Sequence, residues 1–142
     1  MSKKQKIFLP TILVVLSLLV VQCQSYYQRN IKYHTDLQRH QYKDAEQTLD
    51  HFKLLKKERN ELLFNLEKGK LAHLQHQFLE SNTYFNKADI LIEDYKKSAK
   101  DNALELVSNP QMQLYQAEDF EKVFIHYYKA LNYIYLNDME GA

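Results

Sequence analysis

The stretch FLESNTYFNKADILIEDYKK, residues 78–97, decides the fold. Its apolar and small side chains recur at steps of three and four residues, which predicts an α-helix that buries one face. That inner face is predicted to comprise Phe78, Ser81, Phe85, Ala88 and Ile92. The same order of large and small side chains occurs 36 residues earlier, at Tyr42, Ala45, Leu49 and Phe52. The sequence therefore predicts a repeated helical unit.

Helical periodicity extends over most of the remaining chain. Helices are predicted over residues 42–57 and 61–77, with Asn60 as the N-terminal cap of the second. A further short helix is predicted over 98–107, followed by a loop over 108–116. The chain has only two Gly and two Pro among 142 residues, and this scarcity of turn residues argues against an all-β fold. We predict an all-α protein.

A last predicted helix starts at Glu118 and Asp119 and continues through Tyr135. Its apolar residues fall on one broad face, formed by Phe120, Val123, Phe124, Tyr127, Leu131, Ile134 and Tyr135.

Earlier in the chain, Gly69 lies in the middle of a predicted helix, where Gly costs about 1 kcal/mol relative to Ala. We expect the close approach of a neighbouring helix backbone to offset that cost.

The repeated pattern resembles a tetratricopeptide unit, in which a small residue of the first helix lets the second helix pack closely. Gly69 takes that small position, 16 residues before Phe85. The last helix resembles the first helix of another unit, with Ala130 at the small position and Tyr133 at the aromatic one. Residues 139–142 resemble the start of its second helix. We therefore expect the apolar face of the last helix to be under-covered.

Several short motifs carry a more specific resemblance. They are EDFE (118–121), HYY (126–128), ALNY (130–133) and DMEGA (138–142), with ELL (61–63), EKG (67–69) and FNKAD (85–89). Over roughly residues 23–142, the chain resembles a family of uncharacterised tetratricopeptide-like bacterial lipoproteins. The resemblance implies an α-solenoid of helical hairpins in an exported, lipid-anchored scaffold. It also implies that the chain is the N-terminal portion of a longer protein.

The N-terminus has the layout of a secretion signal, with Lys3, Lys4 and Lys6 before an apolar run at 7–21. At 1.5 Å per residue the run spans about 22 Å, less than the roughly 30 Å of a bilayer core. Cys23, the only cysteine, follows LVVQ, which resembles a lipobox, where the signal is cut before a cysteine that receives lipid. An uncleaved anchor and plain secretion are the alternatives. All three place the folded part outside the cytoplasm, at the bacterial cell envelope.

Three segments are thus predicted: a signal peptide at 1–22, a tether with a first weak helix at 23–41, and an incomplete repeat domain at 42–142. Removing the three N-terminal lysines from the 19 basic residues leaves 16 against 18 acidic ones, a net charge of −2. A nearly neutral body does not have the basic surface that nucleic acids require. The expected partners are therefore the bilayer, bound through acylated Cys23, and an envelope protein or peptide.

No catalytic or phosphate-binding motif occurs in the sequence, and we predict neither enzymatic activity nor a cofactor. Aromatic side chains supply large contact area at low entropic cost, so a tyrosine-rich last helix predicts a binding surface for a partner. The candidate contacts are Tyr127, Tyr128, Tyr133 and Tyr135.

Two other sites were considered from residue type and spacing. His126 with Glu118 or Asp119 has the components of an acid–base site in a small-ligand-binding or enzymatic envelope protein. His73 and His76, with Glu80 as a third ligand, have the components of a metal site. The preferred interpretation of the first set places Tyr127 in the core, with His126 and Tyr128 lining a groove or facing solvent. For the second set it is a solvated polar helix flank. A chain without independent function is a further alternative, if the repeat domain is incomplete.

Overall fold

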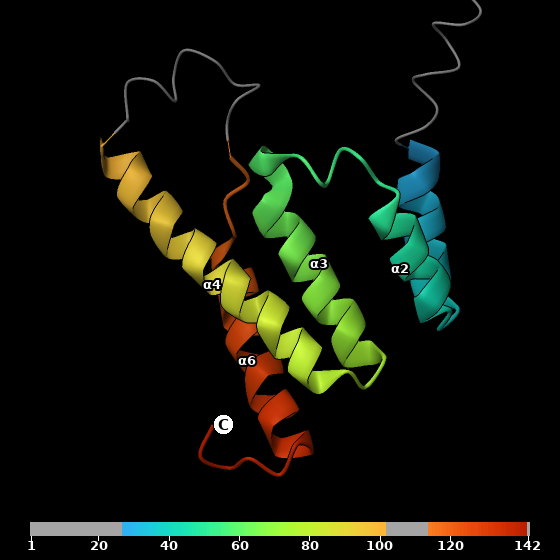
Figure 1. Ribbon diagram of the computed structural model, residues 1–142. Coiled ribbons are helices and arrows are strands. Elements are labelled where there is room, and N and C mark those ends of the chain that lie inside the picture. The colour runs from blue at the N-terminus through green and yellow to red at the C-terminus, as the bar shows by residue number, and fades with distance from the viewer. Residues whose placement is uncertain (1–26, 102–113, 142) are drawn as a thin grey trace, which may run out of the picture.

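The computed structural model describes residues 27–101 and 114–141 (Figure 1). Its helices are 27–38, α2 (Tyr42–Asp50), α3 (Glu61–Leu74), α4 (Phe78–Asp101) and α6 (Asp119–Tyr135), with a short 3-10 helix, η1 (Glu58–Asn60). Within these two ranges there is no strand, which confirms the all-α prediction. The predicted signal peptide, Cys23 and most of the predicted 98–107 helix and 108–116 loop lie outside the described residues.

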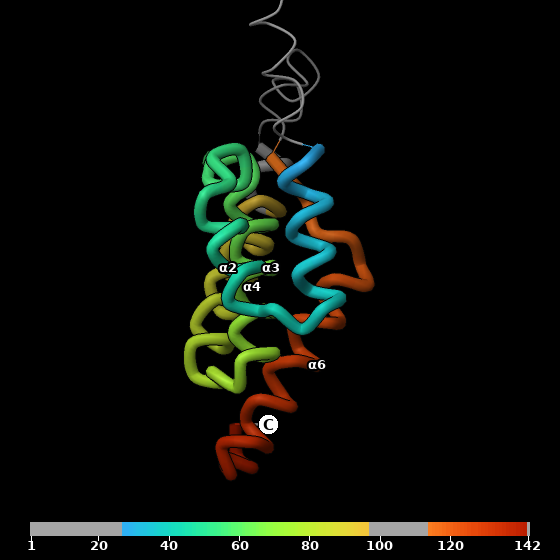
Figure 2. Tube along the Cα trace, turned by 90° about the vertical axis from the view of Figure 1, so that its right-hand side faces the viewer, coloured from blue at the N-terminus to red at the C-terminus, as the bar shows by residue number. Residues whose placement is uncertain are grey.

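Successive helices run in opposite directions along the chain (Figure 1). Helix 27–38 is followed by α2, which returns beside it, and α3 is followed by α4 in the same way. α6 then runs back along α4 and also contacts α3. When the molecule is turned, α2 and α4 lie on one side, and helix 27–38 and α6 on the other (Figure 2). The molecule is therefore a series of antiparallel helical hairpins.

Helix α2 is shorter than the sequence predicts. It ends at Asp50 rather than near Lys57, and a series of turns leads to η1. These turns direct both Phe52 and Leu55 into the core, with 4% and 9% of their surfaces exposed. In a continued helix these two residues, which are three apart, would lie on the same face, about 60° from each other around the axis. After Asp50 the helical bonds are replaced by turn bonds, in which Phe52 N–H donates to the Leu49 carbonyl and Leu55 N–H to the Phe52 carbonyl.

Three turns between helices share one backbone geometry. His40, His76 and Asn137 each have a positive φ, of 57°, 60° and 57°. In each turn the next residue donates its N–H to the carbonyl five residues earlier, over 2.8 Å, 2.8 Å and 2.9 Å. This is the Schellman motif that closes a helix and redirects the chain. The first two turns are 36 residues apart, as the sequence repeat predicts, and the third follows 61 residues later.

The first two of these turns also share a side-chain contact. His40 packs edge-on against Tyr42, and His76 packs edge-on against Phe78, each with ring centres 5.8 Å apart. The sequence signal is the tripeptide His-Gln-aromatic, which occurs at 40–42 and again at 76–78. The signal is not part of the apolar periodicity, although it marks the end of one helix and the start of the next.

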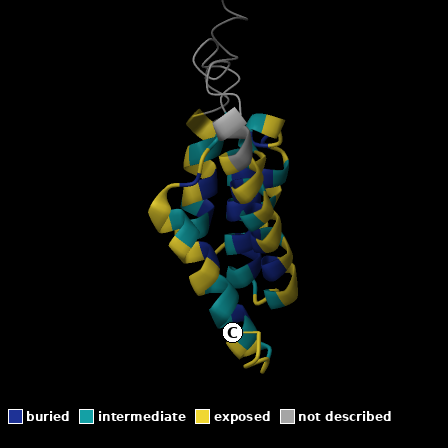
Figure 3. Cartoon of the chain, turned by 90° about the vertical axis from the view of Figure 1, so that its left-hand side faces the viewer, coloured by how far each residue is buried: buried dark blue, intermediate teal, exposed yellow. Residues whose placement is uncertain are grey.

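Helix α3 contributes to two hydrophobic clusters. On one side, Leu71 joins helix 27–38 and α2 in a cluster that includes Tyr33, Ala45, Leu49, Phe52 and Leu55. On the other side, Leu62 and Leu66 join α4 and α6 in a cluster that includes Phe85, Ala88, Ile92, Ala117 and Ile125. Buried residues occupy the interior between the helices, while exposed residues cover the outside (Figure 3). Lys68, also buried, bonds Glu46 of α2 at 2.5 Å.

The inner face of α4 is the predicted one. Ser81, Phe85, Ala88 and Ile92 are all buried, with Phe78 partly so. Gly69 of α3 lies against this face as expected, but the group that requires a glycine is a side chain rather than a backbone. A Cβ at residue 69 would lie 2.8–2.9 Å from three atoms of the Phe85 ring. Ser81 also donates its hydroxyl to the Gly69 carbonyl over 2.8 Å.

The contact between Gly69 and Phe85 predicts an unusual response to a Gly-to-Ala change. Overpacking against the ring costs about 1–3 kcal/mol, whereas the better helix propensity of Ala returns about 1 kcal/mol. We expect Gly69→Ala to lower the free energy of unfolding in urea by about 1 kcal/mol. In a Phe85→Leu background the same change should be neutral or stabilising. Equal destabilisation in both backgrounds would contradict the proposed cause.

Candidate functional site

The start of α6 is held by a side chain of its own first turn, Glu121, and by Tyr115 in the segment before it. Glu121 accepts the backbone N–H of Glu118 over 2.9 Å, which satisfies one of the free donors at a helix N-terminus. Its carboxylate also accepts the hydroxyl of Tyr115, at 2.8 Å and 2.9 Å. The backbone N–H of Tyr115 in turn donates to the carbonyl of Arg59 over 2.7 Å. The segment before α6 is thus tied to the segment before α3.

Only a narrow strip of α6 faces the core. Ile125 and Asn132 are the buried residues of this helix, with 1% and 0% of their surfaces exposed. Between them Tyr128 stacks on Phe85, with ring centres 5.6 Å apart. Lys129 pairs with Asp89 of α4 at 2.7 Å. The buried contacts of α6 with the hairpin are therefore one isoleucine and one amide, with aromatic stacking and an ion pair beside them.

The buried amide of Asn132 joins three helices. Its nitrogen donates to Ser81 Oγ over 2.8 Å and to Asn82 Oδ1 over 2.7 Å, both on α4. Its oxygen lies 2.6 Å from Nδ1 of His73 on α3. Because both amide protons are used, the oxygen acts as acceptor and His73 carries its proton on Nδ1. Every polar atom of the Asn132 side chain is thus bonded.

One member of the network has a donor without a partner. Among the described residues, only Asn82 has a buried side-chain atom, Nδ2, without a hydrogen-bond partner. Turning the amide over would place nitrogen against the nitrogen of Asn132, so the bond from Asn132 determines its orientation. Asn82 therefore keeps the hydrogen bond that its Oδ1 accepts from Asn132, and its own Nδ2 stays without an acceptor.

The predicted apolar face of α6 is present, and most of it faces solvent, as expected for an under-covered helix. Val123 is 67% exposed, Phe120 61% and Tyr127 54%, and Phe124 and Ile134 are also exposed. We call Phe120, Val123, Phe124, Tyr127 and Ile134 the open face of α6. Monomeric proteins rarely leave such a continuous apolar stripe uncovered, and stripes of this kind mark interaction sites.

The four tyrosines proposed as partner contacts fall into two groups. Tyr127 and Tyr135 are exposed on α6 and available to a partner. Tyr128 and Tyr133 are half-buried: Tyr128 stacks on Phe85, and Tyr133 packs at the position where Gly141 would carry a Cβ. Tyr135 also stacks on Phe78 of α4, with ring centres 4.7 Å apart. Of the four tyrosines, only Tyr127 and Tyr135 are placed for contact with another molecule.

The open face corresponds to a surface that is covered elsewhere in the same molecule. The turns at His76 and Asn137 align α6 with α3 at an offset of 61 residues. By this offset Val123, Tyr127 and Ala130 match Leu62, Leu66 and Gly69. Those three residues of α3 are all buried. At Val123 and Tyr127, α6 thus exposes positions that α3 buries, while Ala130 is half-buried.

The other candidate residues are not brought together. His126 is exposed, and Asp119, seven residues earlier on the same helix, lies about 10 Å away along the axis. Asp119 pairs with Lys122 at 2.8 Å. His73 is not on a solvated flank, because it bonds Asn132 and contacts the rings of Phe78 and Tyr128. Among the described residues, no three metal-binding side chains cluster.

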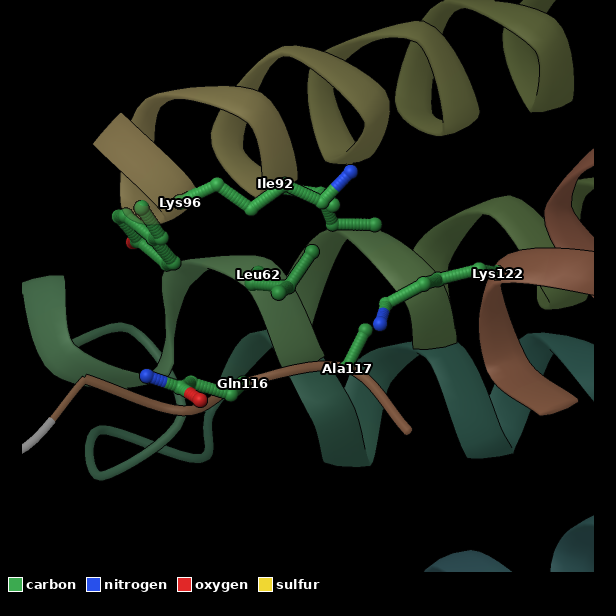
Figure 4. A pocket seen from close by; sticks show the side chains of 7 residues that line it. Leu62, Ile92, Lys96, Gln116, Ala117 and Lys122 are labelled. Atoms are coloured by element: carbon green, nitrogen blue, oxygen red, sulfur yellow. The ribbon is translucent and has the colours of Figure 1, made fainter. Parts of the chain in front are cut away.

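Two hollows lie beside α6. The first, of about 300 Å³, lies between α3, α4 and the segment before α6. Ile92 and Lys96 of α4 extend over Leu62, with Gln116 and Ala117 on the opposite side (Figure 4). The second, of about 260 Å³, lies between α3 and α6. We call it the acidic hollow, and its walls include Leu66, Glu67, Phe85, Glu121, Phe124 and Tyr128.

Comparison with protein-family models, with curated proteins and with solved structures gave no match. Within 27–101 and 114–141, none of the helices combines the length and the apolar character needed to cross a bilayer.

The polar network predicts unequal effects at two neighbouring asparagines. Asn132→Leu removes three hydrogen bonds and leaves Asn82 Oδ1 and His73 Nδ1 buried without partners, at about 1–3 kcal/mol each. We expect the free energy of unfolding to fall by about 3 kcal/mol. Asn82→Leu removes one bond but also the unpartnered donor, so it should cost less than about 1 kcal/mol. Urea unfolding followed by circular dichroism measures both, and equal losses would contradict this account.

Proposed function

We propose that this protein is a membrane-anchored, non-enzymatic scaffold of tetratricopeptide-like hairpins that binds a helix of a partner protein at the bacterial cell envelope. The observation that carries the proposal is the open face of α6. The face is apolar and aromatic, it runs along most of one helix, and it is exposed although equivalent residues of α3 are buried.

The repeated turns support the tetratricopeptide-like arrangement. Each of the three turns ends one helix with one residue in the left-handed conformation and the same backbone bond. In the third turn Asp138 Oδ1 accepts the N–H of Gly141 over 3.0 Å, the bond that an N-cap makes three residues into a helix. In arrays of this kind each unit leaves a face that a neighbouring helix covers.

The covered face of α3 indicates what would fit on α6. α4 meets α3 with large residues alternating with small ones, namely Phe85 with Ser81 and Ala88. α6 presents Ala130 where α3 presents Gly69, so an antiparallel helix with the same alternation would find similar space. We therefore assign the open face to an amphipathic helix of a partner, a recognised mode of binding between proteins.

The N-terminal segment supports the location. A charged and then apolar segment followed by Cys23 is typical of a lipid-anchored protein. Each buried CH₂ of an acyl chain contributes about 0.8 kcal/mol, so two or three chains anchor a protein stably where one does not. Such a tether would hold the open face close to a membrane and near envelope partners.

The anchor is tested by expressing the full chain in a bacterium and analysing its N-terminal peptide by mass spectrometry. We expect Cys23 to be the N-terminal residue, with its mass raised by a diacylglycerol and its amine acylated or free. Cys23→Ser should lack this modification and lose its retention in detergent-extractable membranes. A mature protein with a free Cys23 thiol would refute the lipid anchor.

Helix binding is tested with a synthetic, fluorescently labelled peptide of residues 78–96, which carries the α4 pattern. The full chain is placed in lipid nanodiscs, and empty nanodiscs serve as the blank. We expect saturable binding by fluorescence anisotropy, weakened at least about tenfold by Tyr127→Asp, which corresponds to about 1.4 kcal/mol. Ile90→Asp is the matched control, because Ile90 is similarly exposed, at 61%, but lies on α4.

Other outcomes overturn the proposal. Binding that Tyr127→Asp and Ile90→Asp reduce equally would show that the open face is not specific. A dimer that Tyr127→Asp dissociates in sedimentation would identify a second copy as the occupant. In a longer form of the protein, a further helix of the same chain could protect Tyr127 from solvent. That result would show that this helix, and not a partner protein, covers the open face.

A further inference from the structure

The acidic hollow is continuous with the open face. Phe124 belongs to both: it is 51% exposed on α6, and it forms one wall of the hollow. Its ring contacts Tyr127 of the open face and Tyr128 of the hollow, each with centres 6.4 Å apart. A side chain on a helix that covers the open face would therefore find the hollow directly beside it.

Carboxylates and aromatic rings line the hollow together. Glu67 projects from α3 and Glu121 from α6, and Phe85, Phe124 and Tyr128 supply the rings. With Lys70, the three charged lining residues carry a net charge of −1. Lys70 pairs with Glu67, and its Nζ lies 5.6 Å from the ring centre of Tyr33, on the side of helix 27–38. Glu121 bonds Tyr115 and the backbone of Glu118, and it forms no ion pair with any residue that the structure describes.

Neither carboxylate has exhausted its capacity to accept bonds. Glu67 accepts the hydroxyl of Tyr33 and pairs with Lys70. Glu121 accepts one hydroxyl and one backbone N–H. A carboxylate offers about four acceptor sites, so sites remain on both groups.

Three tyrosines near these carboxylates have raised pKa values, first because they are buried and then because of nearby negative charge or hydrogen bonds. Burial, followed by the charge of Glu67, raises the pKa of Tyr33. Burial, followed by the bond to Glu121, raises the pKa of Tyr115. Burial, with Tyr127 and Glu67, raises the pKa of Tyr128. Hydroxyls from three segments thus resist ionisation where these two carboxylates converge.

We propose that the acidic hollow binds an arginine side chain carried by the helix that docks on the open face. The inference rests on the proposed function and adds the chemistry of the partner. A guanidinium stacks on aromatic rings and donates paired hydrogen bonds to carboxylates, whereas an ammonium acts as a compact point charge. The hollow, at about 260 Å³, is smaller than the roughly 300–1,000 Å³ of small-molecule pockets, and suits a single side chain.

The test uses a probe that does not depend on helix docking. N-acetyl-arginine methylamide is titrated into the full chain in nanodiscs, with ¹⁹F-labelled phenylalanine as the reporter. The citrulline analogue, which has nearly the same shape but no charge, is the matched ligand. We expect the signals of Phe85 and Phe124 to shift, with an affinity about tenfold higher for arginine than for citrulline.

Two variants locate the site. Glu121→Gln preserves the bond from Tyr115 but removes the charge, and it should reduce the affinity for the arginine probe about tenfold. Glu80→Gln, an exposed carboxylate on α4 outside the hollow, should leave it unchanged. Equal shifts with arginine and citrulline, no shifts at all, or equal effects of the two variants would overturn the proposal.

The proposed function and this inference fail separately. If the helical peptide binds and the arginine probe does not, the open face remains a docking site while the arginine pocket is excluded. If the arginine probe binds and the helical peptide does not, the hollow is a cation site and the helix-binding function is excluded.

Discussion

The arrangement of this molecule depends on one buried amide. Asn132 is fully enclosed, and its bonds to Ser81, Asn82 and His73 are satisfied in one orientation of α6 only. An apolar residue at the same place would be tolerant of rotation about the helix axis, because dispersion contacts have little directionality. The hydrogen bonds exclude such rotation, since any turn of α6 would leave buried polar atoms unpaired. The open face points to solvent because the polar bonds turn the opposite side of the helix inward.

Much of the hairpin architecture could be predicted from local pattern. The α4 stripe is correct because Ser81, Phe85 and Ala88 recur at helical spacing and need only one neighbouring helix. The end of α2 was predicted seven residues too late, because the sequence up to Lys57 continues a helical pattern while the chain turns after Asp50. The left-handed histidines lie at turns that ordinarily favour glycine or asparagine, so their residue type concealed the stop.

The candidate site was less accessible to sequence reasoning. The apolar stripe of α6 and its lack of cover were predicted, because the last helix resembles the first helix of a unit whose second helix does not follow in the sequence. His73 and Asn132 are 59 residues apart, and no periodicity connects a histidine with an asparagine on another helix. The acidic hollow joins residues from α3, α4 and α6, each ordinary in its own segment. A polar residue on the inner side of an otherwise apolar helix is the sequence signal for a buried hydrogen-bond network. Asn132 is such a residue.

The double role of α3 has a consequence for how the molecule unfolds. In linear repeat proteins, neighbouring units can melt in sequence because each contacts only the next. Here Leu71 faces one cluster and Leu62 the other on a single helix of fourteen residues. Loss of α3 would dissolve both clusters at once, so partly melted intermediates would have little to stabilise them. Cooperativity in this protein therefore resides in a shared central helix, and native-state opening should be restricted to the outer segments.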